Sequence, residues 1–318
     1  MRIGKPASRV SPKRCGLALL TSVTTISLCL LGVQPAAAAV TVTSHFIWTA
    51  TSSNTLSGLV TVINNAATNG NPNAILFVTP VYDSGGVCGC VTMTDPIAVY
   101  YLGGDQMWGI MDSVISPSNI PAGSEFNVLV VQKPSSSVFI ATATASNTSG
   151  NGFTVSKKST VGKPGALLQV TQNYTPDGHE VPSVNGHAPG VVYGLGAGAN
   201  QWDIQNLDNA TMPVGAAYNV MVGSGASNGG KATLLSGTSS NTVGPLIKIS
   251  NNETNGNPNA VVFETQNADP NLNFGFGDPN QTGVGYATSP DDFEYVFNED
   301  GNSMPTPPTY FNLLVFPS

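Results

Sequence analysis

Arginine is absent from this chain after Arg14, and few other charged residues take its place. Charged residues make up only 9% of the 318 residues. Of the 11 basic side chains, five lie in residues 1–39. The six that follow are outnumbered by 18 acidic side chains, so that part carries a net charge of −12. Nucleic acids and anionic membrane surfaces attract positive charge, so we expect neither as a partner.

Cysteines are also few, and no long apolar run follows the first residues. A basic start at 2–14, an apolar stretch at 15–33 and small residues at 36–39 are typical of a secretory signal, so we expect 1–39 to be removed on export. No later segment approaches the roughly 20 apolar residues of a membrane-spanning helix. Only Cys88 and Cys90 remain. A strained bond between them, a bridge to another chain and free thiols are all open.

One unit of sequence occurs three times. The stretch NGNPNAILFVTPVY at 69–82 returns as VGKPGALLQVTQNY at 161–174 and as NGNPNAVVFETQNA at 255–268. Tyr100, Tyr193 and Tyr286 keep the same step, 93 residues. A fixed period of this kind indicates internal repeats. We divide the chain into a secretory signal peptide and three β repeats, with these bounds: 1–39, 40–133, 134–226 and 227–318.

Each repeat has the pattern of short strands. SGLVTVINN alternates apolar and polar residues, as a half-buried strand does, while AILFVT suits a strand that is covered on both faces. The chain holds 35 Gly and 23 Pro, and no segment combines helical spacing with capping signals. We predict an all-β fold of three homologous units, each a small antiparallel β-sandwich or barrel. The units either stand as separate domains or close into one pseudo-threefold body.

Several motifs resemble a domain family of secreted bacterial proteins, in which the domain is often found in tandem. The first repeat carries NGNPNAILFVTP, DPIAVYY and EFNVLV, and the second carries VTQNY, HAPGVVY, WDIQN and MPVGAAYNV. The third carries NGNPNAVVFETQN and MPTPPTYFNLLV, without the tryptophan of W-x-I-x-N. In the first repeat, Asp112 stands where that motif has Asn. The resemblance implies the repeated fold unit and secretion, and it implies no established activity.

Polar and aromatic residues recur at the strand ends of the repeats. Asn and Gln side chains hydrogen-bond sugar hydroxyls, and aromatic rings stack on sugar faces. The same residues also serve as core packing and turn caps, which is the competing interpretation. The candidate ligand-binding residues are Tyr82, Tyr174, Gln172, Asn173, Gln266, Asn267, Trp108 and Trp202. For Asn127, Asn219 and Asn312, which follow an aromatic residue within a strand, we expect a structural hydrogen bond.

Catalytic and metal-binding patterns are weak. Ser227 lies in GASNG, but no histidine follows it, so we name no catalytic residue. His179, Glu180 and His187 share one loop and are zinc-ligand types, with a solvated polar loop as the alternative. Residues 298–302, NEDGN, place oxygen ligands beside a glycine as calcium loops do, with a solvated acidic face as the alternative. We expect no cofactor, and calcium is the one ion kept as a candidate.

These observations favour a secreted, non-enzymatic protein for binding or surface interaction. Carbohydrate or a cell-surface component is the expected ligand class, because the repeated Asn, Gln and aromatic residues suit it and linked weak sites add avidity. Two alternatives stay open. One is an extracellular hydrolase acting on a polymer, and the other is a structural or assembly protein. The sequence leaves the oligomeric state and any metal site unspecified.

Overall fold

The computed structural model describes residues 41–84, 91–114, 119–194, 200–223, 229–268, 277–288, 293–305 and 308–317. They belong to one compact unit, Ala36–Ser318. Their regular elements are strands, together with short 3-10 turns such as Pro176–Gly178, so the all-β prediction is confirmed. No helix among the described residues is long and apolar enough to cross a membrane. The predicted signal peptide, Cys88 and Cys90 lie outside the described residues.

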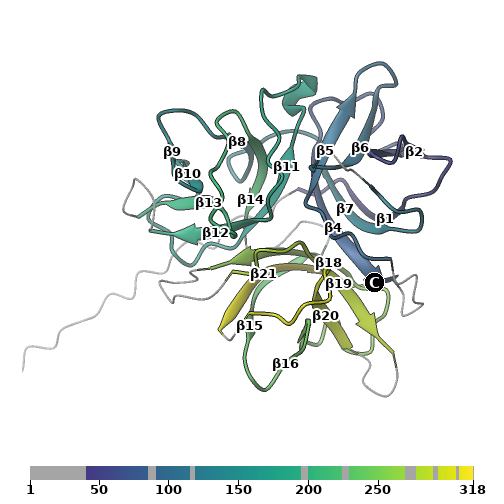
Figure 1. Cartoon of the computed structure of the whole chain (residues 1–318), viewed down its shortest axis with the longest axis vertical. Coiled ribbons are helices and arrows are strands. Elements are labelled where there is room, and N and C mark those ends of the chain that lie inside the picture. The colour runs from purple at the N-terminus through teal and green to yellow at the C-terminus, as the bar shows by residue number, and fades with distance from the viewer. Residues whose placement is uncertain are drawn as a thin grey trace, which may run out of the picture. The chain divides into compact units, whose positions relative to one another are not determined.

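Within the described ranges, each repeat contributes seven strands in the same order. Figure 1 labels most of them. The first supplies β1 (Ser44–Thr49), β2 (Thr55–Leu56), β3 (Val60–Ile63), β4 (Ile75–Asp83), β5 (Ile97–Leu102), β6 (Met107–Asp112) and β7 (Glu125–Val131). The second supplies β8 (Val138–Thr142), β9 (Thr148–Ser149), β10 (Gly152–Val155), β11 (Leu168–Asn173), β12 (Pro189–Tyr193), β13 (Trp202–Asn206) and β14 (Ala217–Val222). The third supplies β15 (Lys231–Gly237), β16 (Thr242–Val243), β17 (Leu246–Lys248), β18 (Val261–Asn267), β19 (Thr282–Ala287), β20 (Phe293–Asn298) and β21 (Thr309–Phe316). The repeat boundaries themselves stay a prediction.

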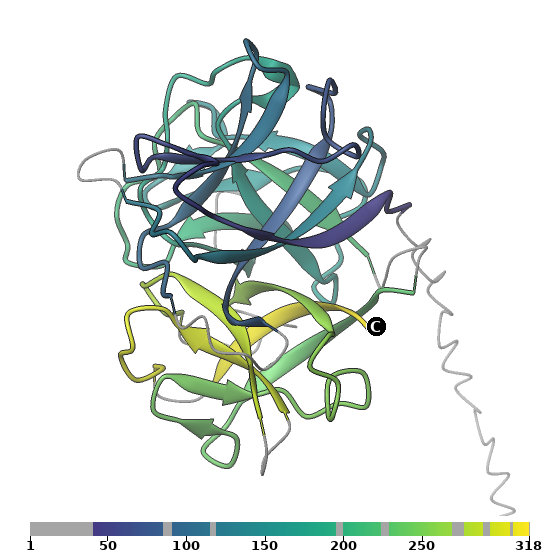
Figure 2. The same ribbon diagram turned by 90° about the vertical axis from the view of Figure 1, so that its right-hand side faces the viewer.

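Every sheet combines strands of two repeats. The orders are β1-β7-β4-β19-β20-β17-β16, β15-β21-β18-β12-β13-β10-β9 and β8-β14-β11-β5-β6-β3-β2. Each sheet therefore joins three strands of one repeat to four strands of another, and we call these parts half-sheets. The first repeat joins the third, the third joins the second, and the second joins the first, so the exchange is cyclic. Figure 2 gives the side view of the same strands.

The two half-sheets of a sheet meet in a parallel strand pair, whereas the described pairings within the half-sheets are antiparallel. The three parallel pairs are β4 with β19, β11 with β5, and β18 with β12. We call them seams. In Figure 1 the blue strand β4 lies beside the yellow-green strand β19, although about 200 residues of chain separate them. Because each seam links two repeats, no repeat completes its own sheets.

Each repeat still encloses its own hydrophobic core between its three-stranded and its four-stranded half-sheet. The first core gathers Leu76, Trp108, Ile110, Phe126 and Val128. The second contains Phe153, Val191, Trp202, Ile204 and Tyr218, and the third contains Ile247, Val262, Val296, Phe311 and Leu313. Each unit is therefore a small β-sandwich, as expected, whose sheets continue into its neighbours.

A fourth apolar cluster joins all three repeats. It contains Phe77 and Leu129 of the first repeat, Met221 of the second, and Phe263 and Phe316 of the third. Strand β4 explains this arrangement, because alternate side chains of a strand point to opposite faces. Leu76 and Val78 face the core of their own repeat, while Ile75 and Phe77 face the shared cluster. The nearly unbroken apolar run AILFVT is thus covered on both faces.

Three threonines fasten the central strands β4, β11 and β18 to one another. The main-chain N–H of Val78 donates to Thr171 Oγ1 at 3.0 Å, and that of Val170 donates to Thr265 Oγ1 at 3.0 Å. The N–H of Glu264 completes the cycle by donating to Thr79 Oγ1 at 3.2 Å. Each hydroxyl satisfies a buried N–H of another repeat, which would otherwise be costly to bury.

Three asparagines repeat the pattern on the neighbouring strands. Asn127 Nδ2 donates to the carbonyl of Val262 at 2.8 Å, Asn219 Nδ2 to that of Leu76 at 2.8 Å, and Asn312 Nδ2 to that of Leu168 at 2.9 Å. Each bond crosses to a different repeat, and all three side chains are buried. The expectation of a structural hydrogen bond at these positions is confirmed.

Replacing Asn219 with alanine tests the contribution of these cross-repeat bonds. Asn219→Ala leaves the buried Leu76 carbonyl without its partner, and it also removes the acceptor of Asn173. We expect a loss of about 2–3 kcal/mol in the free energy of unfolding, measured by urea denaturation. Asn73→Ala, at an exposed position in the same chain, should change it by less than about 0.5 kcal/mol. Equal effects of the two substitutions would refute the role assigned to Asn219.

Candidate functional site

The two tryptophans predicted to bind ligand lie inside the cores of their repeats. Trp108 and Trp202 are fully buried, and each packs edge-on against a tyrosine at 5.4 Å, Tyr101 and Tyr193 respectively. Their Nε1 atoms donate to the carbonyls of Asn71 at 2.8 Å and Lys163 at 2.9 Å. Neither ring reaches the surface. In this structure the two tryptophans pack in the cores and are not placed to stack on a sugar.

The four predicted Gln and Asn residues are also buried, because they lie on the central strands at two of the seams. Asn173 and Asn267 donate to the Oδ1 atoms of Asn219 and Asn312, each at 2.9 Å, and so orient the cross-repeat asparagines. These four side chains hold the fold and are not displayed to a ligand at the surface.

The glutamines make an equivalent pair of contacts. Gln266 pairs with the main chain of Asp278, donating to its carbonyl at 2.9 Å and accepting from its N–H at 2.7 Å. Gln172 makes the same pair with Asn185, at 2.7 and 2.8 Å, when its amide is oriented to match. Each glutamine therefore ties a central strand to the loop that leads to the next strand of its own repeat.

Tyr174 lies half-buried where the second repeat meets the first. Its ring stacks on that of Tyr100 at 5.6 Å with an interplanar angle of 24°. The Tyr100 hydroxyl donates to Glu180 Oε1 at 2.9 Å, and Glu180 itself is exposed. Tyr100 points away from the core of its repeat, since the core contains its neighbours Val99 and Tyr101. We call Tyr100, Tyr174 and Glu180 the tyrosine platform.

Tyr82 occupies the corresponding position where the first repeat meets the third. Its half-buried ring lies 4.7 Å from that of Phe297, which contacts Tyr295 at 6.3 Å. Phe297 and Tyr295 are both largely buried. At the third seam, Ala268 takes the position equivalent to Tyr82 and Tyr174. The tyrosine is therefore present in two of the three repeats. The ligand-binding role of Tyr82 and Tyr174 stays a prediction.

A cavity of about 40 Å³ lies between the central strands, where the three repeats meet. We call it the axial cavity. Val78 and Ile97 of the first repeat, Val170 and Ala188 of the second, and Glu264 and Thr282 of the third line it, together with Thr171, Gln172, Pro189, Thr265, Gln266 and Gln281. The first repeat therefore lines the cavity with apolar residues, the second with both apolar and polar residues, and the third with polar residues.

Glu264 occupies the position that Val78 and Val170 hold in the other repeats. Its side chain is 9% exposed. Oε1 accepts a hydrogen bond from the Thr282 hydroxyl at 2.8 Å, while Oε2 is buried without a hydrogen-bond partner among the described residues. Burial raises the pKa of Glu264 to about 7, with a further upward contribution from Asp278, although the Thr282 bond lowers it. Sequence analysis did not single out this residue, and aligning the three copies of the strand would have found it.

Two more carboxylates lie close to Glu264. Burial raises the pKa of Glu299 to about 8, and its Oε2 accepts the Met93 N–H at 3.0 Å. Burial also raises the pKa of Asp278, against hydrogen bonds from the Asn280 N–H at 3.0 Å and from Asn298 Nδ2 at 2.6 Å. Glu299 belongs to NEDGN, the predicted calcium loop. Its side chain turns into the protein, and the Asn298 amide is engaged by Asp278.

The third repeat carries one further buried carboxylate, Glu294, in place of a tryptophan. Glu294 pairs with Tyr286 across β19 and β20 as Trp108 pairs with Tyr101 and Trp202 with Tyr193. Burial, with a contribution from the nearby carboxylate of Asp83, raises its pKa well above the usual value. Its Oε2 and the Oδ1 of Asp83 have no hydrogen-bond partner among the described residues.

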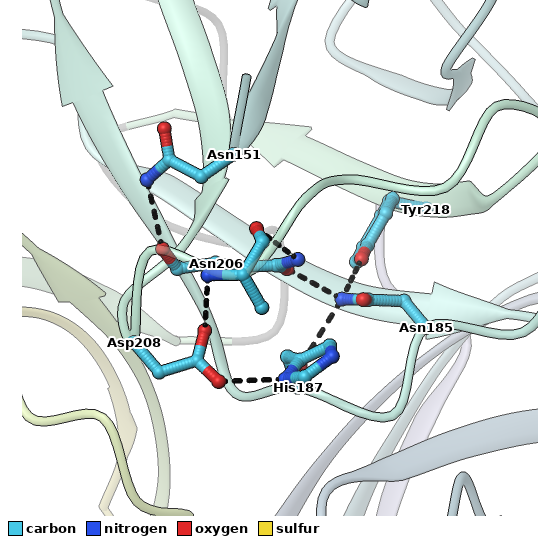
Figure 3. A network of polar contacts seen from close by, with 7 residues as sticks. Asn151, Asn185, His187, Asn206, Asp208 and Tyr218 are labelled. Atoms are coloured by element: carbon cyan, nitrogen blue, oxygen red, sulfur yellow. Dashed lines mark hydrogen bonds and ion pairs between the residues drawn. The ribbon is translucent and has the colours of Figure 1, made fainter.

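Two of the proposed zinc ligands, His187 and Glu180, have other partners. His187 Nδ1 lies 2.6 Å from Asp208 Oδ2, and Glu180 contacts Tyr100 as described above. Figure 3 shows His187 at the edge of a network in which Asn185 Nδ2 donates to Asn206 Oδ1 and to the Tyr218 hydroxyl, each at 2.7 Å. Within the described ranges, no group of three His, Cys, Asp or Glu side chains is arranged to hold a metal ion. Ser227 lies outside those ranges.

Three copies of one β-sandwich unit, joined by shared sheets, define this protein as a tandem-repeat all-β protein. The chain belongs to the family described as Domain of unknown function (DUF7452), which matches it at residues 35–117, 104–222 and 190–315. Three tandem copies of the domain thus cover residues 35–315, and the repeated unit expected from the motifs is confirmed. Neither a curated protein nor a solved structure matched the chain.

The buried carboxylates predict that stability falls as pH rises. A carboxyl whose pKa is raised on folding binds its proton more tightly in the folded state than in the unfolded state. The free energy of unfolding therefore decreases from the unfolded pKa, 4.5, up to the folded pKa, about 7 for Glu264 and about 8 for Glu299. We expect urea denaturation in tetramethylammonium buffers, between about pH 4 and pH 9, to show this decrease.

Glu264→Gln isolates the contribution of one residue. It should remove the part of the decrease that lies between pH 4.5 and about 7, on the order of 3 kcal/mol. Glu253→Gln, which alters an exposed ion pair with Lys231, serves as the control and should leave the profile nearly unchanged. An identical pH profile for wild type and Glu264→Gln would contradict the assignment.

Proposed function

We propose that this protein is a secreted, non-catalytic binding protein whose ligand is a carbohydrate, free or on a cell surface. The tyrosine platform is the observation that supports the proposal. A stacked tyrosine pair, half-exposed and bonded to an exposed carboxylate, offers an apolar ring face beside a hydrogen-bond acceptor. Sugars present that same combination of C–H faces and hydroxyl donors.

The seam gives the platform a rigid base. Strands β5 and β11 pair beneath it, and the apolar residues Val60, Ala98 and Met111 pack under the rings. Tyrosines held in this way lose little side-chain freedom when a ligand binds, which lowers the entropic cost of association. The contact also needs two repeats, since Tyr100 comes from the first and Tyr174 from the second.

The hydrolase alternative receives less support from the geometry. Of the buried carboxylates only Glu264 lines the axial cavity, whose volume is about 40 Å³, whereas sites for small molecules occupy roughly 300–1,000 Å³. A sugar ring does not fit between the central strands without their separation. The structural or assembly alternative has no exposed apolar patch to support it among the described residues, where the exposed large apolar side chains are Ile47, Leu56, Val161, Val214 and Val243, spread over several elements.

A glycan and polysaccharide array with the protein lacking residues 1–39 tests the proposed function. We expect wild type to bind at least one carbohydrate, and Tyr174→Ala to weaken that binding at least about tenfold, or about 1.4 kcal/mol, since it removes one stacking face. Tyr82→Ala alters the equivalent position at another seam and shows whether the ligand binds there as well. Both variants should retain the wild-type circular dichroism spectrum.

Three results would count against the proposal. They are the absence of binding to every glycan, an affinity that Tyr174→Ala leaves unchanged, and equal losses in Tyr174→Ala and Tyr82→Ala. The last result would place the ligand at both seams and remove the special role of the tyrosine platform.

Secretion is proposed from the basic, apolar and small-residue segments of 1–39. Expression of the full chain in a bacterial host that exports proteins should release a form whose N-terminus is Val40, as read by N-terminal sequencing. A version that lacks 1–39 should stay in the cytoplasm. Recovery of the full chain with residues 1–39 still attached would refute removal of the signal.

A further inference from the structure

The tyrosine platform is built from two stretches of chain that hold no lysine or arginine. Tyr100 comes from residues 41–132 and Tyr174 and Glu180 come from residues 174–188, and neither stretch contains one of these two basic side chains. Glu180 forms no ion pair with another described residue. Its negative charge therefore adds to the negative potential of a protein that has more acidic than basic side chains.

The main chain holds Glu180 beside the two rings. The N–H of Val181 donates to the carbonyl of Tyr174 at 2.9 Å, which closes the loop that carries Glu180. The N–H of Tyr174 donates to the carbonyl of Val99 at 2.9 Å and so fixes that loop to the first repeat. The Tyr100 hydroxyl occupies Oε1 of Glu180, while Oε2 accepts no hydrogen bond from a described residue. Because Glu180 is exposed, a ligand can reach this second oxygen.

An apolar border surrounds the two rings. Leu59, Leu102 and Val184 are partly exposed and belong to the same cluster as Tyr100 and Tyr174. The face of an aromatic ring is electron-rich and attracts a cation that lies within about 6 Å of the ring centre. Ring faces, apolar side chains and an unbalanced carboxylate together favour an organic cation, in which a positively charged nitrogen is attached to a C–H framework.

We propose that the tyrosine platform binds an amino sugar through its protonated amine, with the sugar ring on Tyr174 and the ammonium group at Oε2 of Glu180. The inference rests on the proposed function, since it specifies which carbohydrate is bound. An ammonium group donates three hydrogen bonds, so it can bond the carboxylate and the sugar's own neighbouring oxygens together. A uronic or sialic acid would instead bring a second negative charge to Glu180, and like charges repel.

Three oligosaccharides of equal length test the inference. They are an oligomer of glucosamine, the same oligomer with every amine N-acetylated, and an oligomer of a uronic acid. Isothermal titration calorimetry at about pH 6 keeps the free amines largely protonated. The glucosamine oligomer should bind the protein lacking residues 1–39 at least about tenfold more tightly than its N-acetylated form, and the uronic acid oligomer should bind more weakly than either. Added salt should reduce the preference for the free amine.

Two variants locate the charge that selects the amine. Glu180→Gln keeps an acceptor for the Tyr100 hydroxyl and removes the negative charge. It should abolish most of the preference for the glucosamine oligomer over the N-acetylated one. Glu253→Gln removes a carboxylate at the surface of the third repeat and makes the same change in net charge, so it serves as the matched control and should retain the preference.

Four results would overturn the inference and leave the proposed function standing. They are equal affinities for the free and N-acetylated oligomers, tighter binding of the uronic acid oligomer, a preference that survives Glu180→Gln, and an equal loss of preference in Glu253→Gln. A lysine tetramer that binds as tightly as the glucosamine oligomer would overturn the assignment to a sugar. The absence of binding to every oligosaccharide and every glycan of the array would overturn both the inference and the proposed function.

Discussion

The parallel pairing at the three seams is the contact on which the rest of this structure depends. Each seam is short, two residue pairs in each of the three sheets, and would be weak as an isolated strand pair. It persists because the central strands are fixed from both sides. Threonine hydroxyls and asparagine amides satisfy main-chain groups of another repeat, and the shared apolar cluster excludes water from the same region. Polar and apolar contacts are therefore interleaved at the middle of the molecule.

The three repeats have diverged mainly in what they place beside this common framework. The first and second keep a tryptophan at the end of their cores and valine at the axial cavity. The third has Glu294 and Glu264 at these positions, and both carboxylates are buried. Buried carboxylates reduce stability at neutral pH. The first and second repeats show that the fold forms with valine and tryptophan at these two positions. The requirements of the fold therefore do not explain the two carboxylates of the third repeat.

Much of the fold could be predicted from the sequence, because periodicity and turn residues are local signals. The 93-residue step, the strands and the structural role of Asn127, Asn219 and Asn312 all followed from residue patterns. The exchange of half-sheets could not be predicted, since strand pairing between repeats leaves no spacing signal within one repeat.

The site residues were harder to predict for a related reason. In the sequence, four of the predicted site residues look like polar residues at the exposed ends of strands. They are Gln172, Asn173, Gln266 and Asn267. They are buried because a strand of another repeat pairs with them at the seam. Trp108 and Trp202 gave the same ambiguity, because an aromatic ring that recurs suits both a binding surface and a core. Glu264 was hidden in a strand that otherwise looked apolar, and its importance appears only when it is compared with Val78 and Val170.

The cyclic exchange has a consequence for the ancestry of such chains. A polypeptide with one copy of the unit would present a three-stranded half-sheet and a four-stranded half-sheet, each ending at an unpaired central edge. Both edges would be satisfied by two further molecules, arranged as the three copies are here. The present chain thus has the geometry of a homotrimer whose subunits were fused end to end. In a single chain each repeat can change independently, and a carboxylate in one of three equivalent places is an asymmetry that a homotrimer of identical subunits cannot acquire.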